Sequence, residues 1–299
     1  MKVGRFIINI LKKQNLKGIK KRRENYPPHG EFKEFINIPY IDDGNLQHTF
    51  DIYLANKENR RNICVIDIHG GAYIFGEHQD NYPISYFFLK NGFDVINVDY
   101  QPNDGKRDTK DLTDDIAKCL NYAFTHLKDY GLENDRFVIT GDSAGGHFCL
   151  MFTEALLDEE YAKELGYKFP KIDLVCALAN CPVYNFVDIG PGGMTRSGQK
   201  RMFGPHYNDK NALALLSPKV HIKSLTCPLF ISTCKNDFLR LQTLELDADL
   251  KRLGGYTYEL MDIDSDDPKV GHVHNIIDLE LPESQKVNEA MVKFVEKHL

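Results

Sequence analysis

The sequence has no C-x-x-C pair, although seven of its residues are cysteines. Without such a pair, a zinc site or a redox dithiol of the usual spacing is not expected. Most of the cysteines stand inside apolar runs, such as Ile-Cys-Val-Ile at 63–66. That placement is typical of buried thiols that stay reduced inside a cell. We therefore expect a cytoplasmic protein that binds no metal and no other cofactor.

Long apolar runs and internal repeats are also missing. No stretch reaches the length of a transmembrane helix. The formal net charge is -6, and beyond the first residues no basic stripe is interleaved with aromatic residues, so we expect no nucleic-acid partner. A chain of 299 residues with 42% hydrophobic and 27% charged residues is typical of a globular protein with a sizeable core.

Acidic residues are absent from residues 2–23, which contain nine basic ones. The apolar part at 6–11 is short for a signal peptide, and no small-residue cleavage site follows it. Two interpretations stay open. The segment is either a helix that lies on a membrane surface or a helix whose apolar face docks over the rest of the protein. We treat 1–34 as a separate basic segment that joins a cap over the functional site.

From residue 35 onward the pattern alternates between strands and helices. Such alternation predicts one α/β domain, 35–299, with a mostly parallel sheet, an antiparallel hairpin at its start and helices on both faces. The alternation breaks at 183–218, a length that is typical of a small cap inserted over a site. The expected strands are 34–41, 47–54, 63–68, 93–98, 137–140, 172–179, 228–233 and 256–261, and the expected helices are 82–90, 108–130, 144–157, 241–253 and 283–298.

A serine stands where an apolar strand turns directly into an apolar helix. Gly141-Asp142-Ser143-Ala144-Gly145 fits the pattern G-x-S-x-G in that setting. The serine then sits on a sharp turn, and amides at the start of the helix can bind an oxyanion. In a protein without catalysis the same residues would form an ordinary turn between strand and helix. The setting favours Ser143 as a nucleophile.

A serine hydroxyl needs a base, and the base needs an acid that orients it. After a G-x-S-x-G turn the acid is expected first along the chain and the histidine second. Asp237 follows the strand expected at 228–233, at the edge of the sheet where Ser143 also lies. After the next strand, a loop carries His272 and His274. The sequence therefore predicts a catalytic triad of Ser143, Asp237 and one of these histidines.

A second glycine motif, H-G-G-A-Y at 69–73, directly follows the strand expected at 63–68. Glycines after a strand let backbone amides point at a ligand oxygen. The motif is weak evidence alone. Beside a G-x-S-x-G turn it indicates the second part of an oxyanion hole.

Together these motifs resemble those of the hormone-sensitive-lipase-like carboxylesterases of the α/β-hydrolase superfamily, which carry H-G-G-G and G-D-S-A-G-G. The resemblance runs from about Phe35 to the carboxyl terminus and includes Val-Asp-Tyr at 98–100 and Asp-Phe-Leu at 237–239. It implies an α/β-hydrolase fold, and it implies that His69 braces the glycine loop rather than reacting. It also implies an oxyanion hole formed by the amides of Gly71, Ala72 and Ala144.

The sequence departs from this family in two places. Ala72 replaces the third glycine of H-G-G-G, which keeps the amide but crowds the acyl pocket. The family's catalytic histidine stands in H-x-F, which here reads His272-Val273-His274, so the resemblance implies His272 as the base and His274 in the place of the aromatic ring. In an extended loop these two histidines would point to opposite sides, and only one would face Ser143. An H-x-H pair also suits a metal, but no acidic or cysteine ligand stands at a familiar spacing.

Further polar and aromatic residues flank these motifs. We expect Asp142 to fix the cap or a loop by hydrogen bonds. His78 and Asp80 either line the entrance of the site or belong to a solvated loop, and we favour the solvated loop. Four aromatic residues suit a pocket wall and a core equally well: Tyr73, Tyr100, Tyr184 and Phe203.

The leading hypothesis is a serine carboxylesterase that cleaves short-chain, acetyl-like esters of small molecules through an acyl-enzyme. It rests on the triad, on Ala72 and on a glycine-rich cap without a long apolar stripe. The alternatives are an amidase, an arylformamidase or a peptidase on the same fold, and a ligand-binding protein that does no chemistry. Hydrolysis of p-nitrophenyl acetate, compared with that by a Ser143→Ala variant, separates catalysis from binding.

Overall fold

The computed structural model describes residues 31–133, 136–187, 200 and 203–299. The basic segment 1–34 therefore lies outside the described residues, except for its last four, and so does the glycine-rich stretch at 190–193. The roles expected for both stay predictions. In the part of the chain that is described, no helix is long and apolar enough to cross a membrane.

Eight strands form a single sheet: β1 (Lys33–Pro39), β2 (Thr49–Leu54), β3 (Cys64–Ile68), β4 (Asp94–Val98), β5 (Arg136–Asp142), β6 (Asp173–Asn180), β7 (Leu229–Cys234) and β8 (Tyr258–Ile263). Their order across the sheet is β1-β2-β4-β3-β5-β6-β7-β8. β1 pairs antiparallel with β2, and β2 with β4, whereas every later pair is parallel. The predicted parallel sheet with an antiparallel start is confirmed.

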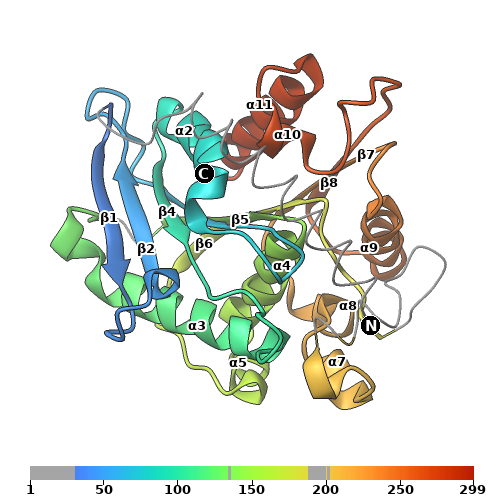
Figure 1. Cartoon of the computed structure of the whole chain (residues 1–299). Coiled ribbons are helices and arrows are strands. Elements are labelled where there is room, and N and C mark those ends of the chain that lie inside the picture. The colour runs from blue at the N-terminus through green and yellow to red at the C-terminus, as the bar shows by residue number, and fades with distance from the viewer. Residues whose placement is uncertain (1–30, 134–135, 188–199, 201–202) are drawn as a thin grey trace.

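Helices cover both faces of this sheet (Figure 1). They are α2 (Tyr82–Lys90), α3 (Thr109–His126), α4 (Ala144–Leu157), α5 (Glu159–Leu165), α7 (Lys210–Leu215), α8 (Pro218–His221), α9 (Arg240–Leu253), α10 (His274–Ile277) and α11 (Pro282–Lys297). α2 and α11 contribute to the core on one face, and α3, α4 and α9 to the core on the other. The α/β-hydrolase architecture expected from the sequence is therefore present.

Some boundaries differ from the predictions, for local reasons. The helix expected at 108–130 ends at His126 and continues as a 3₁₀ turn that Gly131 closes at φ 82°. Helix α5 was not predicted, and it is capped by Asp158, whose carboxylate accepts hydrogen bonds from the amides of Glu160 and Tyr161. The last strand begins two residues later than expected, after Gly254 and Gly255, which both have positive φ.

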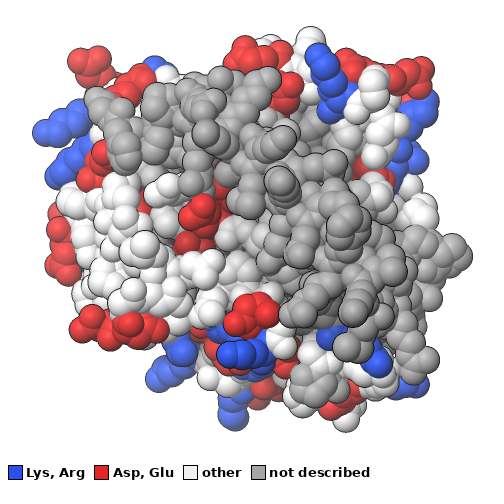
Figure 2. Space-filling view, in the orientation of Figure 1, with Lys and Arg blue, Asp and Glu red and all other residues white. Residues whose placement is uncertain are grey.

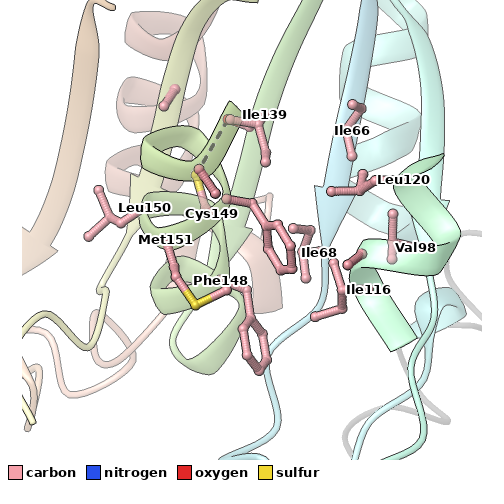
Figure 3. Packing of buried hydrophobic residues seen from close by; sticks show 14 of the residues in the cluster. Ile66, Ile68, Val98, Ile116, Leu120, Ile139, Phe148, Cys149, Leu150 and Met151 are labelled. Carbon is pink, nitrogen blue, oxygen red and sulfur yellow. Dashed lines mark hydrogen bonds between the residues drawn. The ribbon is translucent and has the colours of Figure 1, made fainter. Parts of the chain in front are cut away.

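The central strands feed both cores because successive side chains alternate between the faces of a sheet. Ile66 and Ile139 pack into the core beneath α3 and α4 (Figure 3), whereas Val65 and Val138 pack beneath α2 and α11. A strand covered on both faces carries apolar residues on both, which explains the nearly continuous apolar runs in the sequence.

Helix α4 packs very close to β3, and two glycines make this possible. A Cβ atom on Gly145 would lie 1.9 Å from the carbonyl oxygen of Ile68, and one on Gly141 would lie 2.3 Å from the carbonyl oxygen of Gly145. Both positions therefore exclude a side chain. Farther along α4, Cys149 projects toward the sheet (Figure 3), and its thiol donates to the Ile139 carbonyl at 3.5 Å.

All seven cysteines are buried and free, as the apolar runs around them predict. On the surface, Lys and Arg are interspersed with Asp and Glu around the rim of the face shown in Figure 2. The functional motifs follow the carboxyl ends of the parallel strands, which meet at one edge of the sheet.

Candidate active site

Ser143 occupies a strained turn between β5 and α4. Its φ of 56° and ψ of -114° lie in a region that residues other than glycine rarely adopt. The turn is held because the Ser143 amide donates to the Asn180 carbonyl at 2.9 Å, and the Ser143 carbonyl accepts from the His147 amide at 3.1 Å. Every other residue from 137 to 155 is buried, and Ser143 alone is partly exposed. The turn thus presents this one side chain to solvent.

The glycine loop after β3 has the backbone of a ligand-binding turn. Gly71, Ala72 and Tyr73 have φ values of 120°, 50° and 63°, three positive values in a row. A Cβ atom on Gly71 would lie 1.9 Å from the Phe75 carbonyl oxygen, so only glycine fits there. The amides of Gly71, Ala72 and Ala144 donate no hydrogen bond to any residue that the structure describes. These three donors are available to a ligand.

Asp142 ties the glycine loop to the serine turn, as expected. Its Oδ1 accepts from the Gly70 amide at 3.0 Å and from the Asn81 side-chain amide at 2.8 Å. The same Asn81 amide reaches Asp67 at 3.3 Å. Burial, together with the nearby charge of Asp142, raises the pKa of Asp67 to about 8. Asp67 is therefore neutral at pH 7, and two adjacent buried anions are avoided.

A buried chain of charged groups holds the other side of this loop. His69 Nδ1 donates to the Gly70 carbonyl at 2.7 Å, and its Nε2 donates to Asp99 at 3.1 Å. His78 Nδ1 donates to the second oxygen of Asp99 at 2.7 Å, and its Nε2 lies 3.0 Å from Asp51. Since both nitrogens of each ring face acceptors, both imidazoles are protonated. His69 braces the loop, as the resemblance implies.

The solvated loop favoured for His78 and Asp80 is wrong, because both side chains are buried. Burial opposes the charged form of His78, but its bonds to Asp51 and Asp99 outweigh that effect and raise its pKa to about 10. Asp51 lies on β2 and Asp99 directly follows β4, 27 and 21 positions away along the chain. The local sequence around His78 therefore gives no sign of them.

Asp237 lies in the turn after β7, and its side chain is fully buried. One oxygen accepts from His272 Nδ1 at 2.6 Å and from the Leu239 amide at 2.8 Å, while the other accepts from the Thr233 hydroxyl at 2.8 Å. Burial raises the pKa of Asp237, but the bonds to His272, Leu239 and Thr233 outweigh it, and the net pKa is lowered. Asp237 is therefore a carboxylate with every oxygen engaged.

The two histidines of the H-x-H pair have different partners. His272 Nδ1 lies 2.6 Å from Asp237 Oδ1, which leaves Nε2 for another partner, and 18% of the His272 side chain is exposed. His274 is buried, and its Nδ1 lies 2.9 Å from the Ser284 hydroxyl. Burial lowers the pKa of His274. Of the two, only His272 is joined to the acid.

The extended loop expected at residues 272–274 is wrong. Val273 adopts a left-handed conformation with φ 53°, and His274 begins α10. The left-handed residue turns the chain between the rings. The Val273 amide donates to the Cys181 thiol at 3.4 Å, which anchors the turn at the end of β6.

Contacts across the sheet edge join the serine turn to the acid and the histidine. Ser143 is bonded through its amide to Asn180, and the next residue, Cys181, has its sulfur within 4.8 Å of the ligand atoms of Asp237 and His272. These three side chains are arranged like metal ligands. Burial raises the pKa of the Cys181 thiol well above its usual range.

Sequence reasoning missed three residues that hold this site and one ring beside it. Thr233 bonds the acid, Asn81 bridges two carboxylates, and Asn236 donates to three carbonyls of the histidine loop at 3.2–3.4 Å. The ring of Phe238 packs on His272 with 4.2 Å between ring centres. Asn81 and Asn236 bond residues 14 or more positions away along the chain, and Thr233 bonds a carboxylate four residues on, so no motif in the sequence marks these three.

The described part of the expected cap insertion is aromatic on its inner side. Phe186 packs edge-on against Phe203, Tyr73 and His147, and all four side chains are buried. The other two candidate pocket residues lie elsewhere. Tyr100 stacks on His69 at 4.2 Å, and the Tyr184 hydroxyl donates to Asp249 of α9 at 2.9 Å.

Comparison with known proteins finds one family model and relatives that are named as ester hydrolases. The model of the family described as BD-FAE matches residues 50–242. A probable isoprenylcysteine alpha-carbonyl methylesterase of Arabidopsis thaliana is 21% identical over 65% of this chain and 46% of its own. A probable carboxylic ester hydrolase, LipM, of Mycobacterium tuberculosis is 25% identical over 58% of this chain and 41% of its own. The matched region thus spans less than half the length of these curated relatives.

Among solved structures, esterase B from Lactobacillus Rhamnosis inhibited by a tributyrin phosphonate has a TM-score of 0.85. Its sequence is 22% identical, and the match covers 97% of this chain and 93% of that one. At this level of identity, the likeness establishes a shared fold over almost the whole chain.

The buried pair of His78 with Asp51 and Asp99 predicts a pH-dependent contribution to stability. Because the folded pKa of His78 is raised to about 10, above the usual value of about 6.5, the contribution is present in full below about pH 6.5. It declines as the pH rises and is lost above about pH 10. We expect His78→Gln to lower the free energy of unfolding by about 3 kcal/mol at pH 6 and by much less near pH 10.

Urea unfolding of the wild type and the variant at several pH values measures this difference. His206→Gln is the control, because the side chain of His206 is 57% exposed and lies 4.0 Å from Asp108, where an ion pair contributes little. A loss in His78→Gln that stays constant from pH 6 to pH 10 would contradict the charged state of His78.

Proposed function

The chain belongs to the BD-FAE family, and from that premise we propose that it is a serine carboxylesterase that cleaves esters of short-chain acids through an acyl-enzyme. Ser143 is the nucleophile, His272 the general base and Asp237 the acid that orients it. The hydrogen bond of 2.6 Å between His272 Nδ1 and Asp237 carries the proposal. It leaves the second ring nitrogen free to take a proton, which is what an unactivated serine hydroxyl requires.

In the proposed reaction, Ser143 Oγ attacks the ester carbonyl carbon and gives its proton to His272. The carbonyl oxygen becomes an oxyanion, which the amides of Gly71, Ala72 and Ala144 stabilise. When the tetrahedral intermediate collapses, His272 returns the proton to the departing alcohol. Water then attacks the acyl-enzyme with His272 again as the base, and the carboxylic acid and the free serine are regenerated.

Two features support a short acyl group. Ala72 is exposed and adds a methyl group to the loop whose amide binds the oxyanion. The next residue, Tyr73, is buried against Phe186, and Phe186 packs in turn on Phe203, so this side of the loop is filled by rings. The inhibitor named for esterase B derives from tributyrin, whose acyl groups have four carbons, and we extend that size to this chain. The insertion at 183–218, with the basic segment 1–34, acts in this proposal as the cap.

Ser143→Ala is expected to lower kcat on p-nitrophenyl acetate by about a thousandfold or more, because the nucleophile is lost. Folding should be unchanged, which circular dichroism and thermal unfolding can check. Ser224→Ala is a matched control, since that hydroxyl bonds Asp158 and takes no part in the site. Near-normal turnover in Ser143→Ala would refute the serine mechanism.

The short-acyl proposal predicts how activity changes along a series of p-nitrophenyl esters. As the acyl chain lengthens beyond about four carbons, kcat/KM should fall, because the space beside Ala72 is filled. Acetyl, butyryl, hexanoyl and octanoyl esters with a common leaving group isolate the acyl effect. Highest activity on the octanoyl ester would show that the acyl pocket is long.

His272 and His274 can be compared on the same ester. His272→Ala should approach the loss of Ser143→Ala, since the serine keeps no base. His274→Phe should retain most activity, because the Ser284 hydroxyl still donates to the carbonyl of residue 274, a bond of 3.0 Å in the wild type. An inactive His274→Phe beside an active His272→Ala would reverse the assignment.

A further inference from the structure

The loop that carries Asp237 also carries an exposed aromatic ring. Phe238 is the most exposed large apolar side chain in the described part of the chain, with 70% of its surface open to solvent. Leu241, three residues later at the start of α9, is 59% exposed. Phe238 lies in the turn before α9 and Leu241 in its first turn, so both exposed side chains stand within four residues of Asp237, and the two are here called the apolar lip.

The apolar lip is fixed in place relative to the reacting groups. Asp237 Oδ1 accepts from the Leu239 amide at 2.8 Å, and the Asp237 carbonyl accepts from the Arg240 amide at 3.1 Å. The Phe238 ring lies against His272, with 4.2 Å between ring centres and an angle of 42° between the planes. The ring is open to water and is held by the turn that carries Asp237. Covering it with an apolar group of a ligand is therefore favourable.

The direction of proton transfer decides which part of a substrate reaches this ring. His272 must return its proton to the departing alcohol, so the alcohol oxygen comes within hydrogen-bond reach of the imidazole. The carbonyl oxygen points instead to the amides of Gly71, Ala72 and Ala144. A side chain packed on His272 therefore contacts the alcohol portion of the ester and not its carbonyl oxygen.

We propose that Phe238 and Leu241 form a subsite for the alcohol portion of the ester and that this subsite selects apolar alcohols, an inference that rests on the proposed esterase function. Two exposed side chains are far too few for a stable protein interface, which buries about 800 Å² on each partner. They match one phenyl or branched alkyl group. The preferred substrate class is then a short-acyl ester of an apolar alcohol.

The test compares two acetates whose alcohols have similar acidity but different polarity, benzyl acetate and 2-methoxyethyl acetate. We expect Phe238→Ala to lower kcat/KM for benzyl acetate about fivefold and to leave the value for 2-methoxyethyl acetate within about twofold. Phe238→Leu, which keeps an apolar side chain, should recover most of the loss. Leu46→Ala is the matched control, because Leu46 is 69% exposed between β1 and β2, away from the site, and should change neither value.

Both esters form the same acetyl-enzyme. The rate at which this acetyl-enzyme is hydrolysed therefore reports, independently of the alcohol, how well His272 acts as a base. An equal fall in kcat/KM for both esters, together with slower deacylation, would overturn the subsite and make Phe238 a brace for the imidazole. Absence of Ser143-dependent hydrolysis of either ester would instead overturn the proposed function. Loss confined to the benzyl ester, with deacylation unchanged, supports the subsite.

Discussion

The site depends on the close contact between the start of α4 and the end of β3. This contact exists only because residues 141 and 145 have no side chain, since a Cβ atom at 145 would meet the Ile68 carbonyl at 1.9 Å. It brings the serine turn beside the glycine loop, and the bond from the Gly70 amide to Asp142 fixes the distance between them. An oxyanion hole built from two separate segments needs such a fixed distance, because each amide must reach the same oxygen.

The chain of His69, Asp99, His78 and Asp51 has a different role. Burying charged groups is costly, and the cost is offset here because each imidazole has both a carboxyl oxygen and a second acceptor beside it, with the carboxyl oxygens at 2.7–3.1 Å. Tyr100 adds to this chain, since its hydroxyl donates to the His69 carbonyl at 2.9 Å. The result is a glycine loop whose position is set from both sides, by Asp142 on one and by these charges on the other.

The parts that could be predicted from the sequence are those that local patterns determine. Apolar runs predict the strand before Ser143 and the helix after it. The glycines around Ser143 indicate that the helix packs closely there. Thr233 and Asn236 could not be predicted, because their partners are a carboxylate four residues on and the carbonyls of a loop about 30 residues away. The left-handed conformation of Val273 could not be predicted either. Valine disfavours it locally, and it is held by contacts with residues elsewhere in the chain.

The burial of all seven free cysteines has a practical consequence. Because a thiol must be exposed before an alkylating reagent can reach it, labelling of the native protein reports the opening of its structure. The thiols are well distributed for this purpose, with Cys64 on β3, Cys119 on α3, Cys176 on β6 and Cys234 on β7. Mass spectrometry of the labelled peptides would thus reveal the order in which parts of the sheet come apart, with no need for an engineered probe.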